Sequence, residues 1–134
     1  MMKRVTGIGG VFFKAEDPQQ LKSWYAKHLG FTVDDYGASF LWKDVDQPDH
    51  TPPARTVWSP FKKDSNYFHP SEKPFMFNYR VENLAELVKD LATEGVSIVG
   101  KMEEYPYGKF AWILDPEGNK IELWEPIESN TPEP

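Results

Sequence analysis

The chain has 134 residues and a net charge of −6, from 15 Lys and Arg residues against 21 Asp and Glu residues. This length suits one compact domain, and the scattered basic residues form no positive stripe, so we expect no nucleic-acid partner. The lack of cysteine excludes disulfides and thiolate metal sites, and no apolar run approaches the roughly 20 residues of a membrane span. Because the first residues also lack the apolar core of a signal peptide, we expect a cytoplasmic protein with no membrane partner.

The first predicted elements are an opening strand, a helix over residues 18–29 and a glycine that ends the helix. Asp17 can cap the first turn, Pro18 suits the first helical position, and Gln20 completes a capping box. Gly30 tolerates the left-handed backbone that commonly ends a helix. These residues predict a strand-helix unit at the start of the chain.

The same pattern returns in the second half of the chain, at an offset of 66 (83 − 17). Asn83 and Glu86 form a second capping pair, which predicts a helix over residues 84–94. In the same register, TVWSP at 56–60 matches ELWEP at 122–126. This repeat predicts two copies of a βαβββ module.

The predicted organisation is a single domain with an internal linker and a tail. Prolines at both ends of the segment between the copies indicate a long linker, which is either a functional lid or contact, or a solvated connector. A second proline-rich loop spans residues 44–54 and has the same two interpretations. The predicted boundaries are 1–126 for the domain, about 5–60 and 74–126 for the modules, 61–73 for the linker and 127–134 for a flexible tail.

Four segments carry a family resemblance: GIGGVFFKAEDP, WYAKHLGF, FNYRVENLAELVKDLATEGV and the closing hairpin ILDPEGNKIELWEP. They resemble the vicinal oxygen chelate superfamily, which includes glyoxalase I, extradiol dioxygenases, and fosfomycin and bleomycin resistance proteins. The closing hairpin is the most specific piece, and its Pro, Gly and Asn suit a tight turn between apolar strands. The resemblance implies an α+β fold in which two βαβββ modules form a curved sheet, a bowl with the helices outside.

The resemblance also implies where a metal would bind. Metal-using members take ligands from the first and last strands of each module, and a site of N and O donors needs about three protein ligands. Only Glu122 is a suitable ligand among the matching positions, so we expect no metal and no cofactor. The alternative is a weakly held divalent metal on Glu122, with a loop histidine, His50 or His69, as a second ligand. The matching positions are Gly10, Thr56, Met76 and Glu122.

Strand alternation from these positions nominates the side chains that face the bowl. A cavity lined by aromatic side chains and a few fixed polar groups is typical of a small-molecule site. The opposite faces of the same strands carry almost only apolar residues, which indicates packing under the helices. The predicted site consists of Glu122 as the catalytic residue and of Phe12, Trp58, Met76, Asn78, Arg80, Trp112 and Trp124 as ligand-binding residues.

The role of Glu122 has three interpretations at this point. It is a former metal ligand now held by a hydrogen bond or salt bridge, for instance to Arg80 or Lys14. It is a general base whose pKa is raised by the surrounding aromatic rings. Or it binds an adventitious ion together with water.

Two classes of function follow from these features. The first is a metal-independent binding protein, similar to bleomycin resistance proteins, that holds an aromatic or charged organic molecule in the bowl. The alternative is a glyoxalase-like lyase, isomerase or dioxygenase that uses Glu122 with the weakly held metal. The 5 Trp, 6 Tyr and 9 Phe residues exceed the needs of one small core, so we also expect a homodimer.

Overall fold

The computed structural model describes residues 4–43 and 53–127. His50, most of the proline-rich loop and residues 128–134 of the predicted tail therefore lie outside the described residues. The first half contains β1 (Val5–Ala15), α1 (Pro18–Leu29), β2 (Ala38–Trp42) and β3 (Ala54–Lys62). The second half contains β4 (Phe75–Val81), α2 (Leu84–Thr93), β5 (Glu103–Tyr105), β6 (Gly108–Leu114) and β7 (Lys120–Pro126).

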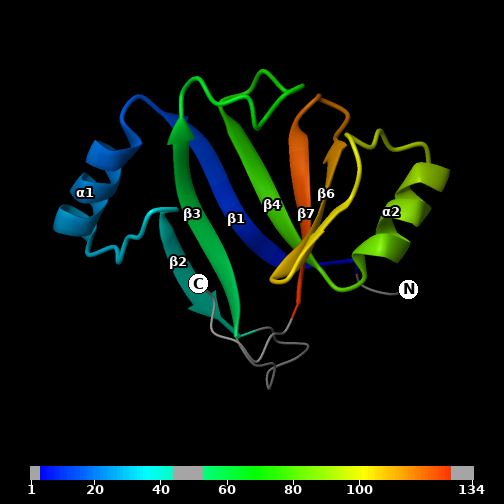
Figure 1. Ribbon diagram of the computed structural model, residues 1–134, viewed down its shortest axis with the longest axis horizontal. Coiled ribbons are helices and arrows are strands. Elements are labelled where there is room, and N and C mark those ends of the chain that lie inside the picture. The colour runs from blue at the N-terminus through cyan, green and yellow to red at the C-terminus, as the bar shows by residue number, and fades with distance from the viewer. Residues whose placement is uncertain (1–3, 44–52, 128–134) are drawn as a thin grey trace.

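The strands form one curved seven-stranded sheet in the order β2-β3-β1-β4-β7-β6-β5. Figure 1 shows the sheet between the two helices, with α1 beside the strands of the first half and α2 beside those of the second half. The α+β fold with helices outside a curved sheet is therefore confirmed. Among the described residues, neither helix has the length and apolar character needed to cross a bilayer.

Both helices begin as the sequence predicts. The side chain of Asp17 accepts a hydrogen bond from the backbone N–H of Gln20 at 3.0 Å, and Asn83 accepts one from Glu86 at 3.4 Å. Gly30 ends α1 with a φ of +73°, the left-handed conformation that glycine adopts without strain. The capping signals were sufficient here because they act within one turn of the chain.

A pseudo-twofold axis passes between β1 and β4, which pair antiparallel at the centre of the sheet. Gly10 faces Asn78, and Phe12 faces Met76. The offset of 66 relates Gly10 to Met76 (76 − 10) and Phe12 to Asn78 (78 − 12), so the twofold exchanges these two pairs. The register that was predicted from the sequence is therefore confirmed for the first strand of each half.

The two halves differ in their outer strands. In the second half, β5 pairs with β6 at the sheet edge, whereas the first half has only the isolated bridge between Val33 and Ala38 in the described residues. The turn before β2 is held tightly, because Lys22 of α1 donates hydrogen bonds to the carbonyls of Asp34 and Asp35 at 3.1 and 3.2 Å. Within the described residues, the first half thus carries three strands where the prediction had four.

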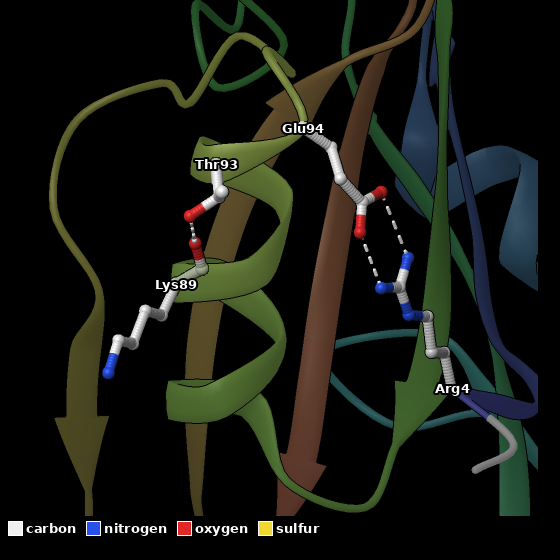
Figure 2. Close-up of polar contacts among 4 residues, drawn as sticks. All are labelled: Arg4, Lys89, Thr93 and Glu94. Atoms are coloured by element: carbon white, nitrogen blue, oxygen red, sulfur yellow. Dashed lines mark hydrogen bonds and ion pairs between the residues drawn. The ribbon is translucent and has the colours of Figure 1, made fainter. Parts of the chain in front are cut away.

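An exposed ion pair joins the start of β1 to the end of α2. Figure 2 shows the guanidinium of Arg4 facing the carboxylate of Glu94, with nitrogen-oxygen distances of 3.2 and 2.6 Å. In the last turn of α2, the hydroxyl of Thr93 donates a hydrogen bond to the carbonyl of Lys89 at 3.0 Å. The ion pair thus links α2 to the N-terminal strand, and the Thr93 bond stays within the helix.

The two sides of the sheet have different packing. Under α2, the buried residues Val81, Leu84 and Leu123 form an apolar core with Tyr79 and Ile121 at its edge. The opposite side, which we call the inner face, carries the residues that alternate with this core along β4, β6 and β7. The inner face contains Met76, Asn78, Trp112, Glu122 and Trp124.

Candidate functional site

Glu122 is a buried carboxylate in the middle of β7, with an exposed fraction of 3%. It lies opposite Asn78 of β4 and opposite Trp112 of β6, because β7 is hydrogen-bonded to both strands. Asn78 Nδ2 donates to Glu122 Oε1 at 2.6 Å, and Trp112 Nε1 donates to Glu122 Oε2 at 2.9 Å. Two neighbouring strands therefore hold the carboxylate through neutral donors.

The linker supplies the third donor to Glu122. The hydroxyl of Tyr67 donates a hydrogen bond to Oε2 of Glu122. The next residue, Phe68, has no exposed surface and packs with Met76 and Trp112. At Tyr67 and Phe68 the linker contacts the inner face, which favours the contact interpretation over the solvated connector for these two residues of 61–73.

The ring of Tyr67 is enclosed by aromatic and cationic groups. It stacks on Phe61 at a centroid distance of 5.7 Å and meets the edge of Trp112 at 6.3 Å. Nζ of Lys120 lies 5.2 Å from the centroid of the Tyr67 ring and donates a hydrogen bond to the Tyr67 carbonyl at 2.7 Å. Burial raises the pKa of Tyr67 well above that of an ordinary phenol, and the negative charge of Glu122 adds to the increase.

Lys120 brings a positive charge to the same cluster. Its exposed fraction is 9%, and its ammonium lies 5.6 Å from the centroid of Trp112 as well as over Tyr67. Burial lowers the pKa of Lys120, while the carboxylate of Glu122 opposes this effect. Glu122, Tyr67 and Lys120 thus form a connected group with a carboxylate, a hydroxyl and an ammonium.

Four further predicted residues also lie on this side of the sheet. Phe12 and Met76 belong to the aromatic cluster beside Trp112 and Phe68. Trp124 stacks on Phe110 at 6.3 Å, and the guanidinium of Arg55 lies 6.0 Å from its ring. Arg80 donates a hydrogen bond to the hydroxyl of Thr6 at 2.9 Å and lies 5.9 Å from the ring of Trp42.

Trp58 does not join this group, and its assignment to the bowl is wrong. Its ring packs against Tyr25 at 4.6 Å and Phe31 at 5.0 Å, so it belongs to the core under α1. The prediction took Thr56 as the repeat partner of Glu122. The strand pairing instead matches Phe12 with Ser59 and Asn78 with Glu122. The offset in the last strands is thus 63 (122 − 59) rather than 66, and an odd shift moves every side chain to the other face.

Of the described positions that the resemblance assigns to metal ligands, Glu122 is the one with a carboxylate. Four positions on the inner face would supply the ligands. They carry Gly10, Met76, Glu122 and, by strand pairing, Ser59. Among the described residues, no group of three His, Asp or Glu side chains is close enough to hold an ion, and His69 is exposed on the linker. Oε1 of Glu122 accepts a hydrogen bond from Asn78, and Oε2 accepts from Trp112 and Tyr67, so neutral donors surround the carboxylate.

Gly9 makes room for the side chain of Asn78. A Cβ atom at position 9 would collide with Oδ1 of Asn78 and would touch the ring of Trp124. Oδ1 of Asn78 is buried and makes no hydrogen bond among the described residues. This unfavourable burial persists because the same amide must direct its Nδ2 toward Glu122.

Sequence reasoning missed Tyr67, Phe68 and Lys120. Lys120 had a usable signal, because the alternation that links Glu122 to Trp124 also places Lys120 on the inner face. Tyr67 and Phe68 lie in a linker without periodicity, so no local pattern indicates which way they point. The position of Tyr67 depends on Glu122 and Lys120, which are 55 and 53 positions further along the chain.

Solved structures with the same fold cover nearly the whole chain. Methylmalonyl-CoA epimerase from Mycobacterium tuberculosis is 19% identical, with a TM-score of 0.62 over 96% of this chain and 93% of that chain. A variant of the Streptomyces coelicolor epimerase, in complex with 2-nitronate-propionyl-CoA, is 12% identical, with a TM-score of 0.66 over 92% and 99%. A glyoxalase/bleomycin resistance protein/dioxygenase superfamily member from Vibrio splendidus 12B01 is 15% identical, with a TM-score of 0.54 over 88% and 97%.

The comparison with curated proteins returned no match. A family model does match, over residues 7–123, which is most of the chain. These residues include both helices, the linker and Glu122. The chain therefore belongs to the Glyoxalase/Bleomycin resistance protein/Dioxygenase superfamily.

Proposed function

We propose that this protein binds a small organic molecule, aromatic or charged, on its inner face without a metal ion. The observation that carries this proposal is the buried carboxylate of Glu122, held by Asn78, Trp112 and Tyr67 instead of by partners that would complete a metal site. A buried carboxylate among aromatic rings is a fixed polar group of the kind that orients a small ligand.

The surroundings of Glu122 support a ligand with a flat or charged group. Lysine and arginine side chains lie against aromatic rings on this side of the sheet, among them Lys120 over Tyr67 and Arg55 over Trp124. Such rings stack on planar groups, and the cations attract anionic ones. The epimerase bound to 2-nitronate-propionyl-CoA supports the idea that this fold accepts small organic ligands.

The proposal is tested by metal analysis and by ligand screening on the same sample. Plasma mass spectrometry of the purified protein is expected to find well below one transition metal ion per chain. A library of aromatic and charged compounds is expected to contain ligands that raise the melting temperature and quench tryptophan fluorescence. Glu122→Gln should weaken these ligands, whereas the matched control Glu117→Gln, at an exposed position of a turn, should leave them unchanged. About one metal ion per chain, lost in Glu122→Gln, would contradict the proposal.

The second candidate is an enzyme of the same superfamily, a lyase, isomerase or dioxygenase that uses Glu122. The observation that favours it is the contact between the Glu122 carboxylate and the Tyr67 hydroxyl, since a carboxylate beside an O–H group can pass a proton. Oε2 of Glu122 accepts hydrogen bonds from both Tyr67 and Trp112, so a substrate proton reaches this oxygen only after Tyr67 has moved. NMR in D₂O can follow the exchange of protons in carbonyl compounds such as methylmalonyl-CoA and so detects proton transfer by Glu122. This exchange would disappear in Glu122→Gln.

A further inference from the structure

We infer that Tyr67 occupies the ligand site from within the chain, and that the ligand is a hydroxyaromatic compound that takes the place of its phenol side chain. This inference rests on the proposed function and names the class of ligand. It also assigns a role to the linker. Neither the family match nor the similar solved structures give the linker a role.

The contacts of Tyr67 are those of a bound ligand. Its ring is stacked on Phe61, lies edge-on to Trp112 and receives the ammonium of Lys120 on one face. Its hydroxyl donates to the carboxylate of Glu122, a charge-assisted hydrogen bond. A phenol held in this way shows directly which chemistry the surrounding residues accept: a flat ring that carries a hydroxyl group.

Tyr67 is also the cover of this group. Its exposed fraction is 40%, whereas Lys120 is 9%, Trp112 is 7% and Glu122 is 3% exposed. The three buried residues supply the acceptor, the indole edge and the cation that the phenol contacts. Rotation of the Tyr67 side chain into solvent would therefore open a site that is already lined for an aromatic hydroxyl compound.

The linker backbone can stay in place while the side chain leaves. Phe68 is fully buried beside Met76, and its carbonyl accepts a hydrogen bond from the N–H of Ser71 at 3.0 Å. The backbone N–H of Tyr67 donates to the hydroxyl of Ser65 at 3.2 Å, and the carbonyl of Tyr67 is held by Lys120. Displacement thus requires only a change of side-chain rotamer, a fast motion for a partly exposed residue.

Internal occupation predicts competition. A ligand that needs the open site binds only those molecules in which the Tyr67 side chain has rotated into solvent. Its apparent affinity is the intrinsic affinity multiplied by the fraction of such molecules. Removing the phenol removes the competitor, and removing only its hydroxyl weakens the competitor. A ligand without a hydroxyl leaves Glu122 without the donor that Tyr67 supplied, so the site discriminates against it.

The test uses p-cresol, which reproduces the tyrosine side chain, and toluene, which lacks the hydroxyl. By isothermal titration calorimetry, we expect wild-type protein to bind p-cresol weakly, Tyr67→Phe to bind it more tightly, and Tyr67→Ala to bind it at least tenfold more tightly than wild type. Toluene should bind each protein at least tenfold more weakly than p-cresol. Adding Glu122→Leu to Tyr67→Ala removes the acceptor oxygens and should remove the preference for p-cresol. Tyr36→Ala, at a tyrosine with an exposed fraction of 79%, is the matched control and should behave as wild type.

Three results would overturn the inference. One is wild-type protein that binds no hydroxyaromatic compound, including 2-naphthol, up to its solubility limit. Another is equal binding of toluene and p-cresol by Tyr67→Phe. This variant keeps the ring and its packing, so it can be measured even if Tyr67→Ala unfolds. The last is a preference for p-cresol that survives Glu122→Leu, which has no acceptor at this position. In each case the proposed function stands if the library contains another ligand that depends on Glu122, so the two failures are distinguishable.

Discussion

Asn78 and Glu122 stand opposite each other on the parallel strands β4 and β7, and the amide of Asn78 donates to the carboxylate at 2.6 Å. The pseudo-twofold counterpart of this pair is Phe12 and Ser59, which stand opposite each other on β1 and β3. The backbone of the repeat is therefore symmetric, but its chemistry is not. The polar cluster lies in the second half, and the equivalent place in the first half carries the aromatic ring of Phe12.

Removal of the Glu122 carboxylate should destabilise the protein. Glu122→Ala leaves the donors of Asn78 and Trp112 without an acceptor in a buried place, so the free energy of unfolding should fall by about 3 kcal/mol. Urea denaturation measures the change. The exposed control Glu117→Ala should stay within about 0.5 kcal/mol of wild type. A Glu122→Ala protein as stable as this control would mean that the hydrogen bonds to Glu122 do not form in solution.

Gly9→Ala should act through Asn78. The added Cβ collides with Oδ1 of Asn78, so the amide must leave Glu122 and the protein should lose about 2 kcal/mol of stability. A double-mutant cycle with Asn78→Ala checks the mechanism, because neighbouring substitutions that share one contact are not additive. In the Asn78→Ala background, Gly9→Ala should cost much less. Equal costs in both backgrounds would place the strain elsewhere.

Alkaline titration should distinguish Tyr67 from an exposed tyrosine. Because the pKa of Tyr67 is raised in the folded protein, its phenol keeps its proton while the unfolded chain loses it above a pH of about 10. The unfolded state then binds fewer protons than the folded state, so this residue stabilises the fold below that pH and its contribution declines as the pH rises further. Stability should therefore fall less steeply above a pH of about 10 in Tyr67→Phe than in wild type.

Ultraviolet absorbance near the phenolate band, recorded while the protein is still folded, measures the same effect directly. Tyr67→Phe should leave the absorbance change unaltered, since Tyr67 does not ionise in the folded state. Loss of one tyrosine equivalent in Tyr67→Phe would show that its phenol is accessible to base.

Trp58→Ala should affect stability without affecting ligands of the inner face. The indole packs against Tyr25 and Phe31 under α1, and truncation of a packed tryptophan costs about 3 kcal/mol. Any ligand found in the screen should keep its dissociation constant at a temperature where the variant is folded. A large loss of affinity would indicate that the ligand lies on the helix side of the sheet.

The protein should form a homodimer, with light scattering giving a mass near twice the 15.5 kDa of one chain. On the two central strands, Ile8 and Phe77 have exposed fractions of 49% and 39%, large values for apolar side chains in the middle of a sheet. The double variant Ile8→Glu with Phe77→Glu should shift the mass toward that of one chain. A wild-type mass equal to that of a single chain at micromolar concentration would contradict the prediction.

Local signals in the sequence are enough for the helices and for the correspondence between the first strands of the two halves. Asp17 and Asn83 cap the two helices through contacts within a single turn, and the constant offset of 66 (76 − 10) relates β1 to β4. Alternation along β4 was also reliable, since Asn78 lies on the inner face two positions after Met76, as predicted. In each of these cases the decisive interaction joins residues that are close in the chain or related by one constant offset.

Completion of the site depends on tertiary packing instead. The offset changes from 66 to 63 (122 − 59) in the last strands, and this odd difference turns Trp58 away from the bowl. Tyr67 reaches Glu122 from a linker without periodicity, because the burial of Phe68 against Met76 draws that segment onto the sheet. Packing between distant segments sets both outcomes, since apolar burial is non-directional and a linker without periodicity does not show which of its residues are buried.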